Sequence, residues 1–323
     1  MAATNMKGRN FLAMADFSTE EIVTALDTAE DLKRKLIRGE SHEVLKGKTF
    51  AMIFERTSLR TRVSFELGMT QLGGHAQFIE TKSIHHGAAW GKKEIGSETL
   101  TDTYRVLEKM VDGIGHRLIS HKAMEEAARD ISIPVINMAS DTEHPCQCMA
   151  DLLTIREKRG ALSGKKVFYS GYPGMAHSLS MCAPRLGVDL YICNPEEYDQ
   201  YYNKGIIGQG EKLASDFGTE LVWTHDYKEA ASNADVVYNC GPASFLPFVG
   251  IDKEKLIEDW KPYETTAETF KHTKKDAIYM HMLPAIRGYA GATDEVLDGA
   301  HSVIFDEAAN RLHAQKGILA LLL

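Results

Sequence analysis

Short apolar runs alternate with amphipathic stretches along almost the whole chain, and this pattern constrains the fold more than any other feature. Such alternation is typical of parallel sheets with crossover helices. In the first half the candidate strands are residues 49–54, 76–80, 113–118 and 134–138, with helices near 61–73, 99–111 and 121–130. The second series of strands comprises residues 165–170, 188–193, 220–224, 235–239 and 277–281. The sequence therefore predicts an α/β fold of two Rossmann-like, doubly wound parallel-sheet domains.

The length of 323 residues exceeds what one hydrophobic core usually supports, so two domains are expected. Residues 144–160 are predicted to form a helix with Pro145 in its first turn, and this helix is expected to link the two series of strands. We place the first domain at residues 1–145 and the second at residues 146–305. Residues 306–323 are predicted to form a final amphipathic helix that packs back on the first domain.

Composition excludes several classes of partner. Hydrophobic residues make up 44% of the chain and charged residues 25%, which is ordinary for a globular protein. The net charge of −8 and the lack of a long basic run argue against nucleic acid or an anionic membrane as partner. The amino terminus is followed by no apolar core of signal-peptide length, and no apolar stretch is long enough to span a membrane, so a cytoplasmic protein is expected. The five cysteines form no C-x-x-C pair and are odd in number, so we expect reduced thiols.

The segment at residues 58–62, Ser-Leu-Arg-Thr-Arg, stands where a predicted strand ends and a helix begins. The first turn of a helix has unpaired N–H groups and a partial positive charge, which together favour an anion. Ser58 and Thr61 add hydroxyl donors, and Arg60 adds a planar fork that can hold two phosphate oxygens. The alternative is an ordinary capped surface helix with basic residues.

Further polar clusters follow other predicted strands. Arg117 and His121 follow a strand of the first domain, and His144 begins the linking helix with Gln147 one turn later. Residues 281–288, His-Met-Leu-Pro-Ala-Ile-Arg-Gly, follow a late strand, and the final helix contains Asn310, Arg311, His313 and Gln315. Ligands of open α/β sheets bind beyond the carboxyl ends of the strands, so most of these clusters can converge on one site.

In this order and spacing, the clusters resemble the aspartate/ornithine carbamoyltransferase family, and its ornithine branch most closely. The resemblance covers essentially the whole chain. It rests on S-x-R-T-R at 58–62, the strand ending in Arg117, H-P-C-Q at 144–147 and residues 306–311 at the start of the last helix. Each motif is weak alone, but the ordered set is specific. The resemblance implies two Rossmann-like domains, a homotrimer, and carbamoyl transfer from carbamoyl phosphate to an amine or amide.

The resemblance also implies roles for individual residues. Ser58, Arg60 and Thr61 would hold the phosphate, and Arg117 would bridge the phosphate and the carbonyl oxygen. His144 would contact the carbonyl oxygen, while Gln147 and the Leu283 backbone carbonyl would contact the carbamoyl NH₂. Leu59, Met282 and Arg311 complete the predicted carbamoyl phosphate site, with Arg60, Arg117 and His144 as its catalytic residues. Donors fixed around the carbonyl oxygen suit this chemistry, because negative charge develops there during attack.

Other chemistries are less well supported by the residues. His85 and His86 suggest a metal, but no third ligand follows at a suitable spacing. The glycines of residues 170–175 follow a strand, yet they lack the G-x-G-x-x-G spacing and include Pro173, so a nicotinamide site is rejected. We therefore expect neither a metal nor a cofactor. Taken alone, His144 reads as a polar cap residue and Arg311 as a member of a surface ion pair.

The second-substrate site departs from the ornithine pattern. Where the ornithine branch has an asparagine that holds the amino-acid carboxylate, this chain has Gly174. Where that branch has an aspartate and then S-M-G, this chain has Cys240, Ser244 and Phe245. Its H-C-L-P has become H-M-L-P, with Met282 in place of the cysteine. The predicted second-substrate residues are therefore Gly174, Met175, Cys240, Ser244, Phe245, Met282 and Arg287.

These departures leave three hypotheses. The preferred one is carbamoyl transfer to a small amine or amide other than L-ornithine, because loss of a buried charged partner weakens binding of an unchanged ligand. The second is ornithine carbamoylation through substituted contacts, which would make citrulline. The third is a non-catalytic paralogue that binds carbamoyl phosphate for regulation.

Residues 81–98 form a polar loop without periodicity that contains Trp90, Lys92 and Lys93. Loops of that length inside a compact domain are often functional. In the aspartate branch the corresponding loop lends a serine and a lysine to the neighbouring subunit's site. The resemblance thus allows these three residues to complete a neighbouring site in the trimer, and a solvated loop anchored by its tryptophan is the alternative.

Overall fold

The structure, a computed structural model, describes residues 5–81, 98–118, 120–241, 252–288 and 291–323. The chain divides into two compact units, residues 1–153 with 310–323, and residues 154–309. The boundaries fall inside helices α5 (Pro145–Arg159) and α12 (Ile304–Leu322). Trp90, Lys92, Lys93, Ser244 and Phe245 of the predicted sites lie outside the described residues.

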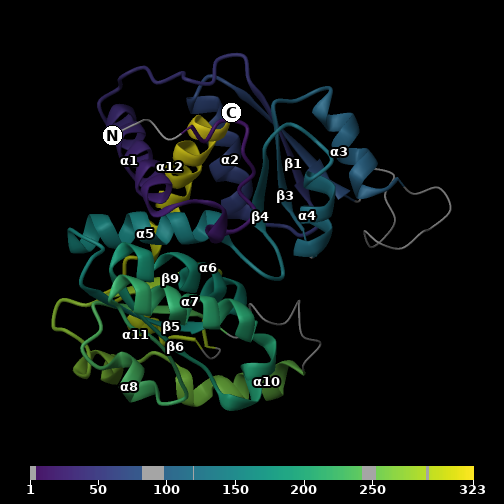
Figure 1. Cartoon of the computed structure of the whole chain (residues 1–323). Helices are drawn as coiled ribbons and strands as arrows, with labels where there is room; N and C mark the ends of the chain where they lie inside the picture. Colours follow the sequence, from purple (N-terminus) through teal and green to yellow (C-terminus); the bar gives the residue numbers. More distant parts are fainter. Residues whose placement is uncertain (1–4, 82–97, 119, 242–251, 289–290) are drawn as a thin grey trace. The chain divides into compact units, whose positions relative to one another are not determined.

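The first unit contains a parallel four-stranded sheet in the order β2-β1-β3-β4 (Figure 1). Its strands are β1 (Thr49–Phe54), β2 (His75–Glu80), β3 (Gly113–Arg117) and β4 (Val135–Ala139). Its helices include α1 (Thr19–Ile37), α2 (Leu59–Gln71), α3 (Leu100–Glu108) and α4 (His121–Ala128), and a 3₁₀ turn, η1, covers Met14–Asp16. The strand positions agree with those predicted from the apolar runs.

Helices cover both faces of this sheet. Ile53 and Ile114 pack with Tyr104 of α3 and Met124 of α4 on one face. On the other face the ring of Phe50 stacks on Phe65 of α2 at 5.5 Å. The alternation of side chains along β1 explains this division, because successive residues of a strand point to opposite faces.

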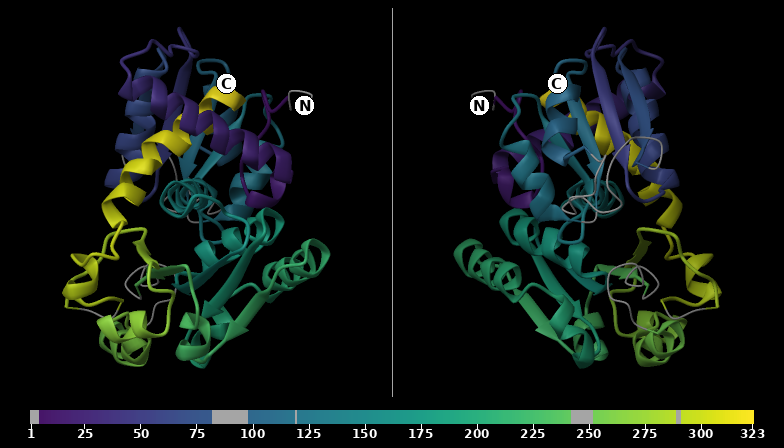
Figure 2. Two further views of the ribbon diagram at one scale, coloured as in Figure 1. Left: turned by 90° about the vertical axis from the view of Figure 1, so that its left-hand side faces the viewer. Right: turned by 90° about the vertical axis from the view of Figure 1, so that its right-hand side faces the viewer.

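The C-terminal part of α12 packs against α1 (Figure 2). The contact is close enough that a Cβ atom at Gly317 would lie 2.7 Å from the carbonyl oxygen of Ala25. At the end of the helix, the carbonyl oxygen of Leu322 accepts a hydrogen bond from the backbone N–H of Gly8 at 2.8 Å. These contacts hold residues 310–323 in the first unit.

The second unit contains a parallel five-stranded sheet in the order β7-β6-β5-β8-β9. Its strands are β5 (Lys165–Gly171), β6 (Val188–Cys193), β7 (Leu221–Thr224), β8 (Val236–Cys240) and β9 (Ile278–His281). Its helices include α6 (Pro173–Cys182), α7 (Lys204–Phe217), α8 (Tyr227–Ala231), α10 (Lys253–Trp260) and α11 (Asp294–Leu297). Short 3₁₀ turns cover Pro184–Leu186, Glu196–Tyr201, Lys261–Tyr263 and Ala267–Lys271.

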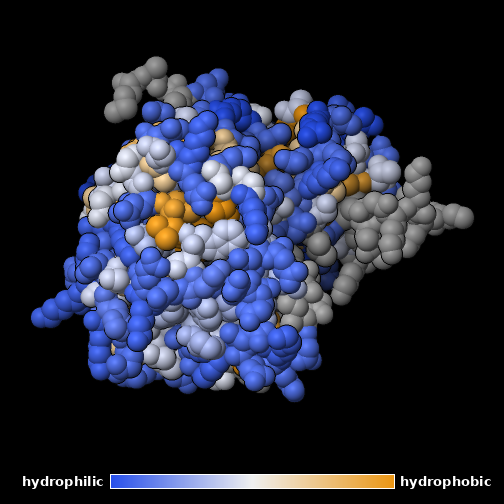
Figure 3. Space-filling view, turned by 60° about the horizontal axis from the view of Figure 1, so that its bottom comes forward, coloured by the Kyte–Doolittle hydropathy of each residue, from blue (hydrophilic) through white to orange (hydrophobic). Residues whose placement is uncertain are grey.

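Phe168 and Val237 of the second sheet pack with α8 and α11, while α6 and α7 pack against each other. Both sheets are wound in two directions from a central strand, as the sequence pattern predicts, so the α/β fold of two Rossmann-like units is confirmed. All five cysteines are free and buried. Within the described part of the chain, no helix has the length and apolar character needed to cross a membrane. The face drawn in Figure 3 is mostly hydrophilic, with a few hydrophobic patches.

Candidate functional site

The segment predicted to bind an anion lies at the start of α2, just beyond the carboxyl end of β1. Ser58 is the N-cap residue, and its Oγ accepts a hydrogen bond from the backbone N–H of Thr61 at 3.3 Å. The same hydroxyl donates to Thr61 Oγ1 at 3.0 Å. Arg60 is half-buried in the first helical turn, whereas the side chain of Leu59 is exposed. The first turn thus combines the positive end of a helix with hydroxyl groups and a guanidinium group.

Arg117 ends β3, beside the first turn of α2. Its Nη1 donates to Thr61 Oγ1 at 3.4 Å and to the carbonyl oxygen of Met138 at 3.4 Å. The register between β3 and β4 shifts between His116 and Arg117. Such irregularities at strand ends often direct a side chain to a functional position. The structure therefore brings Arg117 and Thr61 together, as the ordered motifs predict for parallel strands.

His144 directly precedes α5 and is buried, with only 4% of its surface exposed. Its carbonyl oxygen accepts the first hydrogen bonds of the helix, from the N–H groups of Gln147 and Cys148. Burial holds the pKa of the His144 imidazole well below its ordinary value, and the charges of Arg311, Arg117 and Arg60 lower it further. The imidazole is therefore neutral near pH 7 and offers one N–H donor.

A second set of polar contacts connects α5 with α12 inside the first unit. Arg311 is 2% exposed, and its Nη1 donates to Gln147 Oε1 at 2.6 Å while its Nη2 donates to Thr61 Oγ1 at 3.3 Å. With its amide oxygen turned toward the guanidinium, Gln315 accepts from Arg311 Nε at 2.7 Å. The Nε2 of Gln147 donates to Asp151 Oδ1 at 2.8 Å. Arg311 is therefore a buried member of this cluster, and the alternative of a surface ion pair is wrong.

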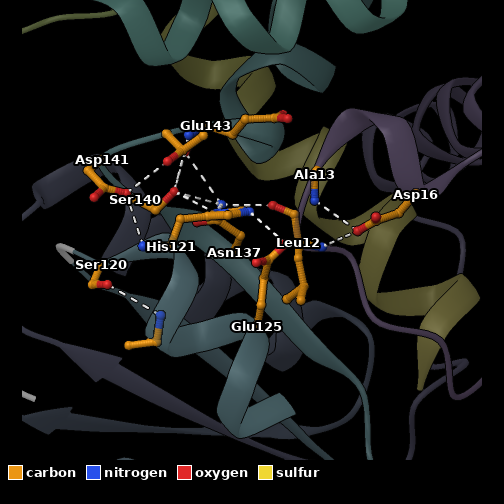
Figure 4. Close-up of polar contacts among 12 residues, drawn as sticks. Leu12, Ala13, Asp16, Ser120, His121, Glu125, Asn137, Ser140, Asp141 and Glu143 are labelled. Carbon is orange, nitrogen blue, oxygen red and sulfur yellow. Dashed lines mark hydrogen bonds and ion pairs between the residues drawn. The ribbon is translucent and has the colours of Figure 1, made fainter. Parts of the chain in front are cut away.

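The loop before His144 is held by a network of buried polar groups (Figure 4). Ser140 Oγ lies 3.0 Å from His121 Nδ1, and it donates to the carbonyl oxygen of Glu143 at 3.2 Å. Asn137 Nδ2 donates to Ser140 Oγ at 3.2 Å, and Glu143 Oε2 accepts from the N–H of Met14 at 3.0 Å. His121, which the sequence groups with Arg117, thus contacts Ser140 and supports this loop.

The predicted acceptor residues lie in the second unit, at the carboxyl ends of its strands. Gly174 and Met175 are buried in the first turn of α6. A Cβ atom at Gly174 would lie 2.5 to 2.6 Å from ring atoms of Tyr172, so the Tyr172 ring fills the space that any larger residue would need. The ring is 4% exposed. A larger residue at position 174 would therefore require the Tyr172 ring to shift.

Cys240 is the last residue of β8 and is fully buried. It pairs with Gly171 of β5, where a Cβ atom would collide with the Cys240 carbonyl oxygen. At the neighbouring strand end, the N–H of His281 donates to Glu307 Oε2 at 2.8 Å, and the N–H of Leu283 donates to His281 Nδ1 at 2.9 Å. Leu283 has a left-handed backbone with φ of 56°, which turns the chain sharply after Met282.

Arg287 is engaged with carboxylates of its own unit. Its guanidinium binds Asp298 in two-pronged fashion, with both N···O distances at 2.7 Å, and its Nη1 also donates to Asp294 at 3.0 Å. The side chain is 46% exposed, so this is a surface ion-pair cluster. An Arg287 that binds a substrate carboxylate would have to share or exchange these partners.

Across the residues that the structure describes, no group of three or more His, Cys, Asp or Glu side chains is arranged to hold a metal ion. His85 and His86 lie outside those residues.

Two residues of these clusters were missed by the sequence analysis. Asp151 is fully buried and stands four positions after Gln147, a spacing that places two residues on the same face of a helix. That spacing is the feature of the sequence that could have identified Asp151 as a partner of Gln147. Tyr172 was read only as part of a rejected dinucleotide turn, and no local pattern predicts that its ring covers Gly174.

Comparison with known proteins gives a separate match for each half of the chain. The chain matches the model of the aspartate/ornithine carbamoyltransferase carbamoyl-P binding domain over residues 9–157 and that of the Asp/Orn binding domain over residues 163–322. It is 46% identical to an ornithine carbamoyltransferase of Carboxydothermus hydrogenoformans over 320 residues, which cover 98% of each chain.

Solved structures give the same result. The ornithine carbamoyltransferase from Pyrococcus furiosus superposes with a TM-score of 0.91 at 40% identity, covering 99% of this chain and 98% of that one. An N-acetyl-L-ornithine transcarbamylase superposes with a TM-score of 0.86 at 30% identity, covering 98% and 100% of the two chains. Both comparisons extend over both units. This chain belongs to the aspartate/ornithine carbamoyltransferase family.

Proposed function

We propose that this protein transfers the carbamoyl group of carbamoyl phosphate to the amino group of an amine and releases phosphate. One observation carries the proposal: the guanidinium groups of Arg117 and Arg311 both donate to Thr61 Oγ1, in the first turn of α2, which also carries Arg60. A phosphate dianion is the natural counter-ion for such a set of guanidinium groups. The match of both halves of the chain to carbamoyltransferase domains supports the same reading.

In this proposal Ser58, Arg60, Thr61 and the N–H groups at the start of α2, including that of Leu59, hold the phosphate. Arg117 and the neutral His144 donate to the carbonyl oxygen, where negative charge grows as the amine attacks. The new C–N bond forms from the lone pair of a neutral amine, and the C–O bond to phosphate breaks. The amine proton ends on the departing phosphate, which is basic enough to accept it.

The acceptor we propose first is L-ornithine. The sequence analysis favoured a different amine, but relatives at 40% and 46% identity over nearly the whole chain carry the name ornithine carbamoyltransferase. The residues aligned with the ornithine-binding positions differ in this chain, so ornithine would have to bind through substituted contacts. The described candidates for those contacts are Arg287, Met282, Met175 in the first turn of α6 and Cys240 at the end of β8.

A second candidate is an amine that lacks one charged group of ornithine, either a decarboxylated amine or an acylated ornithine. The observation that favours it is the Tyr172 ring, which occupies the space beside Gly174 at the start of α6. An aromatic ring offers no charge to a substrate carboxylate, and a buried thiol at Cys240 offers none to an ammonium group. The structural likeness to an N-acetyl-L-ornithine transcarbamylase makes an acylated substrate a realistic alternative.

One experiment separates these possibilities. The protein is supplied with carbamoyl phosphate and, in turn, with L-ornithine, N-acetyl-L-ornithine, putrescine, 2,3-diaminopropionate or L-aspartate, and the ureido product is quantified. The first proposal predicts the highest kcat/KM with L-ornithine. A higher value with an acylated or decarboxylated amine selects the second candidate. Tight binding of carbamoyl phosphate without turnover of any acceptor would instead fit a non-catalytic paralogue.

The organisation of the site is also part of the proposal. We infer that residues 1–145 with the helix at 306–323 bind carbamoyl phosphate, that residues 146–305 bind the acceptor, and that the protein is a cytoplasmic homotrimer. Trp90, Lys92 and Lys93 would then complete the neighbouring subunit's site. Mixing inactive Arg60→Ala chains with inactive Lys92→Ala chains tests this: reassembled mixed trimers should regain activity, and no recovery would argue against shared sites.

A further inference from the structure

The side-chain amide of Gln147 lies between a guanidinium group and a carboxyl group. Its Oε1 accepts from Arg311 Nη1 at 2.6 Å, and its Nε2 donates to Asp151 Oδ1 at 2.8 Å. All three side chains are at most 2% exposed, and they belong to the first unit. The family resemblance gives Gln147 a contact with the carbamoyl NH₂ and places Arg311 in the carbamoyl phosphate site, but it gives Asp151 no role.

Arg311 and Asp151 together fix which way the oxygen and the NH₂ of the Gln147 amide point. A guanidinium group only donates hydrogen bonds, and an ionised carboxylate only accepts them. If the amide were flipped, its NH₂ would face the guanidinium and its oxygen would face the carboxylate, so both contacts would become repulsive. Hydrogen bonds to a charged guanidinium are stronger than those between neutral groups, so the flipped state is disfavoured. Asp151 and Arg311 together thus present the amide as an oxygen acceptor.

The position of Asp151 on α5 suits this role. It sits one turn after Gln147 on α5, the spacing at which Gln–Asp side-chain pairs form. Arg311 has its own further partners in Thr61 and Gln315, so its position does not depend on Asp151 alone. The contact of Asp151 with Gln147 can therefore act on the orientation of that amide.

Resting on the proposed function, we propose that Asp151 is a positioning residue that makes the site selective for a carbamoyl group over other acyl groups. An amide oxygen can accept two hydrogen bonds, so Gln147 Oε1 can accept from the carbamoyl NH₂ while it stays bonded to Arg311. An acyl phosphate with a methyl group in place of NH₂, such as acetyl phosphate, offers no donor. A flipped amide would remove this discrimination.

The test uses two stable phosphonates that differ only at the position of interest. Phosphonoacetamide carries the NH₂ of a carbamoyl group, and 2-oxopropylphosphonate carries a methyl group instead. Their dissociation constants are measured by calorimetry for the wild-type protein and for Asp151→Asn. We expect wild type to prefer phosphonoacetamide by about tenfold, the value of one well-made hydrogen bond, and the variant to prefer it by about twofold or less. Both proteins should bind 2-oxopropylphosphonate equally.

Two controls isolate the role of Asp151. Asp112→Asn makes the same chemical change at a carboxylate that binds Lys48 and Thr49 near the amino ends of strands β1 and β3. This variant should leave the preference for phosphonoacetamide unchanged. In a Gln147→Leu background, Asp151→Asn should have no further effect on the preference. A merely structural role would instead weaken both phosphonates alike.

The outcomes separate this inference from the proposed function. If the wild-type protein binds neither phosphonate, the carbamoyl phosphate site itself is refuted. If wild type prefers phosphonoacetamide and Asp151→Asn keeps that preference, or if the effect of Asp151→Asn persists without Gln147, the role of Asp151 is refuted while the function stands.

Discussion

Thr61 Oγ1 accepts a hydrogen bond from Arg117 Nη1 at 3.4 Å, which joins the first turn of α2 to the last residue of β3. The same oxygen is reached by Arg311 Nη2 at 3.3 Å and by Ser58 Oγ at 3.0 Å. One buried hydroxyl thus orders two guanidinium groups from distant parts of the sequence. This relationship explains why a threonine, and not merely a small residue, suits position 61.

Thr61→Val should weaken anion binding while preserving shape. Valine has the same outline but cannot accept from the two arginines, so the dissociation constant for phosphonoacetamide should rise about tenfold or more. Calorimetry provides the measurement. Thr70→Val, which removes a hydroxyl bonded only to the helix backbone at Glu66, serves as the control. Equal affinities for Thr61→Val and wild type would show that the hydroxyl does not organise the site.

Burial of His144 should make the protein less stable as the pH falls. Because its pKa in the folded protein is well below its value of about 6.5 in the unfolded chain, the unfolded state binds the proton more readily. The stabilising effect is complete above pH 6.5 and is lost progressively as the pH falls below it. Thermal unfolding between pH 5 and 8 should show a shallower acid-side loss for His144→Asn than for wild type. Parallel curves would contradict a buried, neutral imidazole.

Gly174→Ala should destabilise the protein through a collision with the Tyr172 ring. The added Cβ atom would lie 2.5 to 2.6 Å from that ring, and overpacking of this kind costs about 1–3 kcal/mol. Chemical denaturation measures the loss. The same substitution in a Tyr172→Ala background should cost much less, since the ring is gone. Additive effects of the two changes would mean that the steric reason given for Gly174 is wrong.

Substitution of Arg287 should change binding of the acceptor more than it changes the stability of the protein. Its ion pairs with Asp294 and Asp298 are surface contacts, which usually contribute less than about 1 kcal/mol. If Arg287 binds the acceptor carboxylate, Arg287→Ala should raise the KM for ornithine about tenfold, whereas Asp298→Asn should lower it by releasing the guanidinium. Lys271→Ala, which removes an exposed pair with Glu268, is the matched control. Unchanged KM values in both variants would assign Arg287 a purely structural role.

Local patterns predicted the elements well because they follow from periodicity. The strand expected at residues 49–54 is β1, and the helix expected at residues 144–160 is α5. The carboxyl ends of parallel strands meet at one sheet edge, so Arg117 and Thr61 could be brought together from the sequence alone. The order and spacing of the motifs indicated the family to which the chain belongs.

Side-chain contacts that depend on how the chain turns could not be predicted in the same way. The ion pair between Arg287 and Asp298 depends on the turn of the chain after β9, and the approach of the Tyr172 ring to Gly174 depends on the rotamer of Tyr172 at the start of α6. The sequence analysis explained Gly174 by a lost substrate contact, and the structure adds a steric cause. Asp151 was overlooked because a carboxylate on a helix is usually a solvated residue.

The most direct test of the account follows the carbamoyl carbon itself. The protein is incubated with carbon-13-labelled carbamoyl phosphate and L-ornithine, and the label is observed by NMR spectroscopy with Arg60→Ala as the comparison. The account predicts a ureido carbon signal that grows in step with released phosphate in the wild type and is nearly absent in Arg60→Ala. Appearance of the label only as the products of spontaneous breakdown, at the same rate with and without protein for every amine tested, would contradict it.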